Sequence, residues 1–254
     1  MRKIRIGFVA AVLLFASGCA TERYIDEESL KRASDINSQL GVAYMRQGNY
    51  ELALAKLKKA LVQNEDNANA HHYIAELYRR LGKMKDAGIH FNEALSLTPN
   101  DSSLQNNYGV FLCAQKKYDK AQKYFDKVLD DPLYKTKAQV YENMGLCAQR
   151  KGDIKSAEDN LLRAIKMNKR LPNAYLAIAQ INFDKQLYRQ SERHLYKYLE
   201  MAKHNSQSLW LGILLENRKG NKNRVASYSI LLKGKFPDSR ETQLLRKLEA
   251  RGTL

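Results

Sequence analysis

Apolar and small residues recur along most of this chain at the spacing of helices, and the pattern itself repeats every 34 residues. The segment Leu40–Tyr44 (LGVAY) aligns with Ile74–Tyr78 (IAELY), and a glycine follows each segment four residues later. The match continues beyond the glycines, where Ala53 in the first copy corresponds to Ala87 in the second. Helical spacing that is interrupted at a fixed place by a glycine predicts pairs of helices joined by a tight turn.

A repeat of this length with two helices is typical of the tetratricopeptide motif. The match can be followed six times and weakens in the last two units, and we place the units at 34–67, 68–101, 102–137, 138–171, 172–205 and 206–239. Because one helix pair cannot bury its apolar face alone, neighbouring units must stack. The sequence therefore predicts an all-α fold, a right-handed superhelical solenoid of six tetratricopeptide helix pairs.

Three places in each unit explain how its two helices pack. In units one to four, glycine or alanine stands at the eighth and twentieth places, as at Gly41 and Ala53, and leucine or an aromatic residue stands at the twenty-fourth, as at Leu57. Ser191 and Val225 depart from alanine at the twentieth place of units five and six. Small residues let two helices approach closely, and the larger side chain fills the space beside them. After the sixth unit, residues 240–254 are predicted to form a capping helix and a tail, because an open stack needs a polar outer face at its end.

The first 18 residues have the plan of an export signal. Three basic residues, Arg2, Lys3 and Arg5, precede an uncharged run of eleven residues at 6–16. A run this short falls below the roughly 18 residues that cross a bilayer as a helix. We expect residues 1–18 to be removed as a signal peptide.

The residues that follow the apolar run predict a lipid anchor. Ala16-Ser17-Gly18-Cys19 matches the bacterial lipobox, in which cleavage occurs directly before a cysteine whose sulfur carries a lipid. We expect a covalent lipid at Cys19, with residues 19–33 as a tether and a short lead-in helix; ordinary secretory cleavage beside an incidental cysteine is the alternative. Ala20 replaces the aspartate that retains lipoproteins on the inner membrane. The predicted location is the periplasmic face of the outer membrane, with lipid anchoring.

Charge and composition favour a folded, basic body behind this anchor. The chain is 44% hydrophobic, with a mean hydropathy of −0.56. Removal of the three basic residues of the signal lowers the formal net charge from +16 to +13. The positive charges are scattered along the sequence, which favours solvated helix faces over a nucleic-acid partner.

No arrangement of residues typical of catalysis is found. The five histidines include no HExxH motif or other zinc spacing, and the adjacent His71 and His72 must point about 100 degrees apart on a helix. No glycine-rich phosphate loop follows a predicted strand. We therefore expect no enzyme activity, no metal, no cofactor apart from the covalent lipid, and no small-molecule substrate.

Two further cysteines lie near the ends of corresponding helices. Cys113 and Cys147 fall in the first helices of units three and four, which should be near-parallel neighbours. Helix axes 8–10 Å apart allow facing side chains to meet the ~5.5 Å Cα separation of a disulfide, and an oxidising periplasm favours the bond. Two separate buried thiols that act as small apolar side chains are the alternative.

Function is expected to reside on a surface. In tetratricopeptide arrays the second, fifth, ninth, twelfth and thirteenth places of each unit point into a concave groove, where apolar anchors of a helix or an extended peptide bind. On this chain those places are Asp35, Ser38, Val42, Met45, Arg46, His72, Glu76, Arg79, Asn106, Val110, Leu176, Phe183, Trp210 and Leu214. Val42, Met45 and Phe183 are apolar where a solvated face would be polar, while Trp210 is equally compatible with packing between helices.

Four blocks carry a resemblance to a known family. They are NNYGVFLCAQKKYDKAQKYFDKVLDDPLY (106–134), NMGLCAQRKGD (143–153), SLWLGILLENRKG (208–220) and FPDSRETQLL (236–245). These blocks resemble the type IV pilus pilotin lipoproteins, often called PilW or PilF, which have a lipobox and six tetratricopeptide units. The resemblance covers nearly the whole chain after the signal.

The resemblance implies a function and two site assignments. It implies an outer-membrane lipoprotein that binds subunits of the type IV pilus secretin and promotes their localisation and multimerisation. Cys113 and Cys147 match family positions, which favours a disulfide, and the family's apolar groove at the first unit would here involve Val42 and Met45. A general periplasmic adaptor or assembly-factor lipoprotein, serving outer-membrane protein insertion or cell-wall hydrolases, is the alternative.

Overall fold

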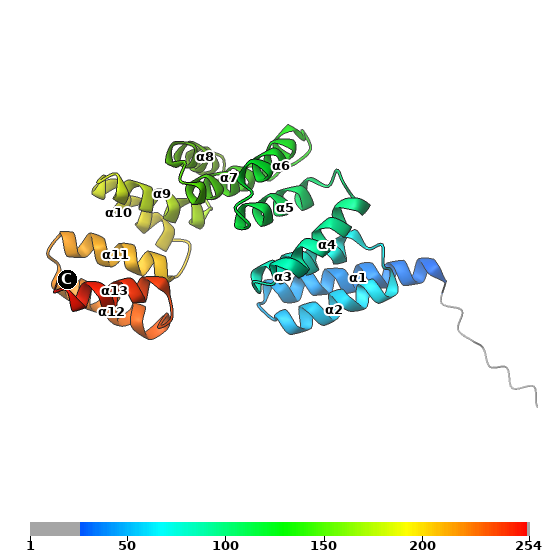
Figure 1. The fold of residues 1–254 in the computed structure, drawn as a ribbon, viewed down its shortest axis with the longest axis horizontal. Coiled ribbons are helices and arrows are strands. Elements are labelled where there is room, and N and C mark those ends of the chain that lie inside the picture. Colours follow the sequence, from blue (N-terminus) through cyan, green and yellow to red (C-terminus); the bar gives the residue numbers. More distant parts are fainter. Residues whose placement is uncertain (1–25, 253–254) are drawn as a thin grey trace, which may run out of the picture.

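The protein folds as the predicted solenoid of helix pairs with a capping helix. The structure is a computed structural model that describes residues 26–252, and within them it contains thirteen helices and no strand. Their bounds are α1 Glu27–Arg46, α2 Tyr50–Gln63, α3 Ala68–Arg80, α4 Met84–Leu97, α5 Ser102–Ala114, α6 Tyr118–Asp130, α7 Lys137–Lys151, α8 Ile154–Met167, α9 Pro172–Asp184, α10 Tyr188–Leu199, α11 Ser206–Arg218, α12 Lys222–Lys235 and α13 Arg240–Ala250. The pairs stack into an arch, with α1–α4 in one arm, α5–α8 at the crown and α9–α13 in the other arm (Figure 1).

The first helix is longer than its unit. α1 begins at Glu27, and its N-cap Asp26 accepts a 2.7 Å hydrogen bond from the backbone N–H of Ser29. Since no glycine or proline interrupts residues 27–40, the segment expected as a separate lead-in helix continues directly into α1. Cys19 and the predicted signal peptide lie outside the described residues. None of the helices that are described combines the length and the apolarity that a membrane span requires.

Close contact between the two helices of a unit depends on the small residues at the eighth place. A Cβ atom added at Gly41 would lie 2.5 Å from Leu57, and one added at Gly109 would lie 2.6 Å from the ring of Phe125. Both distances are far below a normal carbon contact of about 3.5–4.0 Å. In units one and three the large residue at the twenty-fourth place therefore fills space that a Cβ atom at the eighth place would occupy.

The turn inside each unit uses left-handed backbone even where the sequence lacks glycine. Gly152 adopts a φ of 89° after α7, and glycines occupy the same place in units one, two and six. In units three and five the residue is Lys116 or Gln186, each with a φ of 61°. The glycine that marks the repeat in the sequence is thus dispensable for the turn itself, which explains why the pattern weakens while the fold continues.

A disulfide joins the crown of the arch. Cys113 on α5 and Cys147 on α7 are bonded, with their Cα atoms 5.8 Å apart. Both side chains are buried in the cluster that also contains Phe111 and Phe125. The bond links the first helices of units three and four across the interface between repeats.

Candidate partner-binding groove

A hollow of about 440 Å³ lies between the first helices of units one and two. It is lined by Asp35, Ser38, Gln39, Val42, Ala43 and Arg46 of α1 and by Asn69 and Tyr73 of α3. Four of these residues, Asp35, Ser38, Val42 and Arg46, are places that the repeat assigned to a groove. The structure brings them together at the N-terminal end of the stack, and we call this surface the first-unit groove.

The first-unit groove follows one stripe of α1, and the core follows the next. The groove stripe contains Asp35, Gln39, Val42 and Arg46, whereas the buried stripe contains Ser34, Ser38, Gly41 and Met45. Ser38 belongs to both surfaces, because it is buried and still lines the hollow. Met45 was expected in the groove, but it is 5% exposed and packs in the cluster of Leu57, Ile74 and Leu77. Because neighbouring helical residues point about 100 degrees apart, Met45 faces the core while Arg46 faces the groove.

One end of the groove is acidic and fixed. Asp35 Oδ1 accepts a 3.0 Å hydrogen bond from Asn67 Nδ2, which also donates to Ser34 Oγ at 2.8 Å. Asn67 is buried, and its Oδ1 accepts from the backbone N–H of Ala70 at 2.9 Å as the N-cap of α3. The Asp35 carboxylate is therefore held in place by the cap of the neighbouring helix.

The other end of the groove is basic and open. Arg46 is exposed, and no hydrogen bond or ion pair engages its guanidinium among the described residues. Tyr73 lines the same hollow, where burial raises the pKa of its hydroxyl and the positive charge of Arg46 opposes that rise. Val42 lies on α1 between Asp35 and Arg46. Since eleven residues of helix span about 16 Å, the groove offers an acid, an apolar stretch and a base along one short line.

The candidates from units two and three are occupied by contacts within the stack. Glu76 is buried and binds Arg79 in a bidentate ion pair, with N···O distances of 2.9 and 3.0 Å. His72 is 3% exposed, and its Nε2 lies 2.8 Å from Asn107 Nδ2. Burial lowers the pKa of His72, with Glu76 and Asp101 opposing. A neutral ring that accepts the amide N–H agrees with that direction, so His72 connects two repeats.

Asn106 likewise connects two repeats, here units three and four. It is buried, and its Oδ1 accepts a 3.1 Å hydrogen bond from Asn143 Nδ2 of unit four. Glu142 continues the series, since its Oε1 accepts the backbone N–H of Ala174 in unit five at 2.9 Å. Burial raises the pKa of Glu142, and its hydrogen bonds from Gln139 and Ala174 oppose that rise. Sequence reasoning did not identify Glu142, although it stands at the same fifth place as His72 and Asn106.

The apolar candidates of the later units pack against their own neighbours. Val110 lies half-buried against the cluster around Phe111. Phe183 contacts Tyr188 edge-on, with ring centroids 5.4 Å apart. Trp210 is half-buried in the cluster of unit six, Leu176 is buried, and Leu214 is half-buried. These side chains do not join the first-unit groove.

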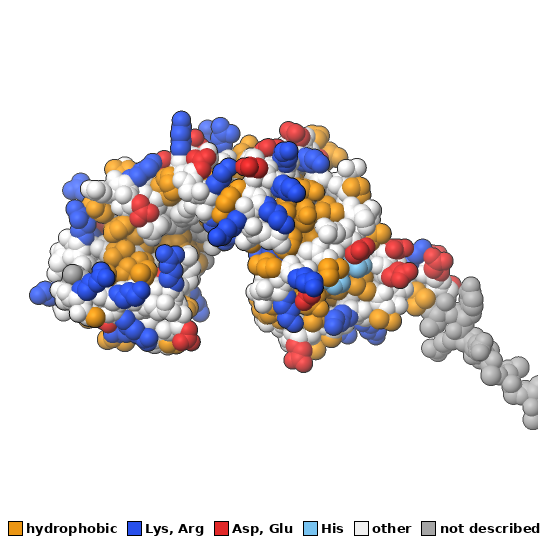
Figure 2. Space-filling model, viewed as in Figure 1, with side chains coloured by type: hydrophobic (Ala, Val, Ile, Leu, Met, Phe, Trp, Pro, Cys, Tyr) orange, Lys and Arg blue, Asp and Glu red, His pale blue; other side chains and the backbone are white. Residues whose placement is uncertain are grey.

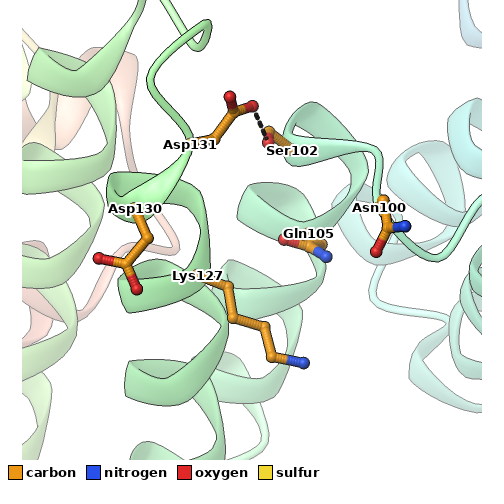
Figure 3. Close-up of a pocket in the computed structure, with 6 residues that line it drawn as sticks. All are labelled: Asn100, Ser102, Gln105, Lys127, Asp130 and Asp131. Carbon is orange, nitrogen blue, oxygen red and sulfur yellow. Dashed lines mark hydrogen bonds between the residues drawn. The ribbon is translucent and has the colours of Figure 1, made fainter.

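A second hollow, of about 470 Å³, lies between the N-terminal end of α5 and the C-terminal end of α6. Figure 3 shows its lining residues Asn100, Ser102, Gln105, Lys127, Asp130 and Asp131. Ser102 Oγ donates a 2.5 Å hydrogen bond to Asp131 Oδ2, which lowers the pKa of Asp131 together with the backbone N–H of Leu133. Within residues 26–252 no group of three or more His, Cys, Asp or Glu side chains is placed to hold a metal ion.

Comparison with known proteins agrees with the repeat pattern. Tetratricopeptide-repeat models match residues 38–102 and 100–170. The type IV pilus assembly protein PilF of Pseudomonas aeruginosa is 28% identical over 246 residues, which cover 94% of this chain and 97% of that protein. A solved structure of Pseudomonas aeruginosa PilF superimposes with a TM-score of 0.69 and covers 86% of this chain and 98% of its own.

The crystal structure of PilW, described as a widely conserved type IV pilus biogenesis factor, is similarly close. It is 30% identical, with a TM-score of 0.69, over 84% of this chain and 97% of PilW. Similarity at this level extends across all six helix pairs and is much stronger evidence than a match to single repeats. The chain belongs to the family of tetratricopeptide-repeat proteins of type IV pilus biogenesis that includes PilF and PilW.

Proposed function

We propose that this protein is an outer-membrane lipoprotein that binds subunits of the type IV pilus secretin and promotes their localisation and multimerisation. Membership of a pilus biogenesis family supports the pathway, and the lipobox at Cys19 supports the anchor. The observation that carries the proposal is the first-unit groove, because it is an open surface with mixed chemistry at the end of the stack nearest the predicted lipid. The role requires binding and no chemical step.

The groove suits a short segment of a partner protein. Amphipathic helices and extended peptides bind such grooves by burying apolar anchors, while polar groups at the edges set their direction. Val42 and Tyr73 supply apolar contact, and the separated charges of Asp35 and Arg46 favour a segment whose own charges run in the opposite order.

A lipid at Cys19 would keep this groove close to the bilayer. Seven residues lie between Cys19 and the start of α1 at Glu27, which makes eight Cα-to-Cα steps, and an extended chain spans at most about 3.5 Å per step. The tether therefore reaches no more than about 28 Å. A bound secretin subunit would be confined to a thin layer beside the membrane, which raises its effective concentration for assembly there.

Replacing one groove residue tests the binding site. Val42→Asp places an unpaired carboxylate in the apolar part of the groove, and we expect co-purification with the secretin to fall at least tenfold. Val62→Asp is the matched control, because Val62 is 88% exposed on α2 of the same unit and lies outside the groove. Equal secretin recovery with both variants would exclude the first-unit groove as the binding site.

Removing the lipid acceptor tests delivery separately. Cys19→Ala, expressed as an exported chain, should retain secretin binding in solution while secretin multimers disappear from the outer membrane. Multimers that stay at normal abundance in the outer membrane would refute the delivery role. Recovery of an outer-membrane insertion factor or a cell-wall hydrolase in place of the secretin would favour the general adaptor.

A further inference from the structure

The fold collects positive charge on one edge of the solenoid. The turns between the two helices of each unit lie along this edge, in the windows 45–52, 79–86, 113–120, 149–156, 183–190 and 217–224. These windows contain 17 Lys and Arg residues against 5 Asp and Glu residues. We call this surface the basic edge.

The opposite edge carries no such excess. It is formed by the turns that connect successive units, in the windows 62–69, 96–103, 129–138, 166–173, 198–207 and 234–241. These windows contain 8 basic and 8 acidic residues. Charges that are scattered in sequence are therefore gathered in space, because each repeat places its own basic turn on the same side of the stack.

Most cations at the centre of the basic edge make no ion pair. Seven exposed side chains in the turns of units two to four make no ion pair among residues 26–252, namely Lys83, Lys85, Lys116, Lys117, Lys120, Arg150 and Lys155. Their neighbours differ, since Lys151 pairs with Asp119 at 2.9 Å and Lys185 pairs with Glu158. Unpaired like charges repel one another and destabilise the compact state, so a bound anion would relieve an existing cost.

The central turns form one continuous surface. Tyr118 of unit three donates its hydroxyl to the backbone carbonyl of Arg150 in unit four at 3.2 Å. Leu81 and Ile154 are apolar side chains in these turns that are 44% and 40% exposed. Cations mixed with exposed apolar side chains can contact both the charges and the backbone of a polypeptide.

The path of the basic edge along the solenoid favours an extended polypeptide over a flat membrane as the ligand. The α1–α2 turn lies on the inner side of the arch, whereas the α11–α12 turn lies on its outer side (Figure 1). Lys and Arg side chains appear across the crown and both arms in one view (Figure 2). A flat bilayer can touch only a few turns of such an edge, while a flexible chain can follow it.

The start of α1 also points away from this edge. α1 has 20 residues and is about 30 Å long, and its N-terminal end lies at the edge opposite to the α1–α2 turn (Figure 1).

We propose that the basic edge of units two to four is a second docking surface, which binds an acidic, extended segment of a protein partner. This surface is separate from the first-unit groove, and its occupancy does not depend on the proposed function.

The probe is a fluorescent peptide of about twelve residues rich in Asp and Glu, which can cross three turns spaced about 10 Å apart. A peptide with Asn and Gln at the acidic positions serves as its control. Binding is measured by fluorescence anisotropy with the full-length chain carrying Cys19→Ala. We expect at least tenfold weaker binding at about 0.5 M salt than at about 0.05 M, because screening shortens the Debye length several-fold.

The test variant is Lys85→Glu/Lys120→Glu/Lys155→Glu. These three lysines lie in the first turns of α4, α6 and α8, where a carboxylate is favourable with the helix dipole, so the variant should fold. Lys58→Glu/Lys59→Glu/Lys123→Glu makes the same change of net charge at exposed sites outside the basic edge. We expect the test variant to lose at least tenfold in affinity for the acidic peptide, and the control to lose less than threefold.

Three results would overturn the proposal. If the acidic peptide does not bind, the basic edge is not a docking surface for such a segment. If both variants lose the same affinity, the protein attracts anions through its net charge alone. The same variants are also tested for sedimentation with vesicles that contain phosphatidylglycerol. If the test variant loses vesicle binding while its affinity for the peptide is unchanged, the occupant of the edge is an anionic membrane.

Discussion

Breaking the disulfide of Cys113 and Cys147 should destabilise the crown of the arch by an amount that can be worked out from its place in the chain. The two cysteines are 34 residues apart in sequence, so the bond closes a loop of one repeat in the unfolded chain. Loop-closure entropy for that length corresponds to about 4 kcal/mol at 25 °C. Because the Cα separation of 5.8 Å lies in the normal range, we expect most of this stabilisation to be realised.

Reduction isolates the effect of the cross-link from the effect of packing. Two thiols remain buried in the same cluster after reduction, so the folded state loses little contact. We expect the free energy of unfolding of the transition that includes units three and four to fall by about 2–4 kcal/mol. At a urea m-value of about 2–3 kcal/mol/M, the midpoint should fall by about 1 M. The m-value should also rise, because the uncrosslinked unfolded chain exposes more surface.

The assay is urea unfolding followed by far-UV circular dichroism, with and without reductant, in the Cys19→Ala background. The double variant Cys113→Ala/Cys147→Ala serves as the control, since its midpoint should not respond to reductant. A wild-type midpoint that changes by less than about 0.2 M on reduction would show that the interface between repeats supplies the stability by itself. A double variant that responds like the wild type would show that the reductant acts elsewhere.

Two further changes test the packing and the pH dependence. Gly109→Ala should lower the free energy of unfolding by about 1–3 kcal/mol, because its new methyl group would lie 2.6 Å from Phe125. Gly234→Ala in α12 is the control and should be neutral or slightly stabilising, because its methyl group meets nothing within 4 Å. Equal thermal midpoints for the two variants would contradict this packing argument. Burial lowers the pKa of His72 below its unfolded value of 6.5, so the folded chain binds fewer protons and stability should fall as the pH drops through 6.5, by at most about 1.4 kcal/mol per pH unit. His72→Gln should flatten this dependence in urea melts at pH 7.5 and 5, and an unchanged slope would assign it to other groups.

The fold was predictable because its information is periodic. Each repeat presents the same small and large residues at the same places, so six independent matches predict one architecture. The weak fifth and sixth units were still assigned correctly as helix pairs, even though the glycine of the fifth turn is replaced by Gln186. A stack imposes its geometry on a unit whose own sequence signal is faint.

The candidate site was predictable only in part. The repeat pattern predicts where a helix lies more reliably than it predicts which of its residues face the groove and which face the core. Val42 and Arg46 line the groove, but Met45, which is adjacent to Arg46 in sequence, points into the core. The polar candidates His72 and Asn106 were placed on the correct helices, yet their partners are 35 and 37 residues away. Contacts over that distance depend on the angle between stacked units, which no single repeat encodes.

The position of the disulfide connects the stability of the crown to the use of both surfaces. In a solenoid each unit contacts only its neighbours, so the arm with the first-unit groove and the arm that ends in α13 keep their relation only through the crown. The bond between α5 and α7 crosses the interface between units three and four, and five of the seven unpaired cations of the basic edge lie in the turn windows that follow these two helices. A loosened crown would therefore change the course of the basic edge while leaving the first-unit groove, which is built from α1 and α3 alone, intact. Reduction should consequently weaken binding of an acidic segment more than binding at the groove.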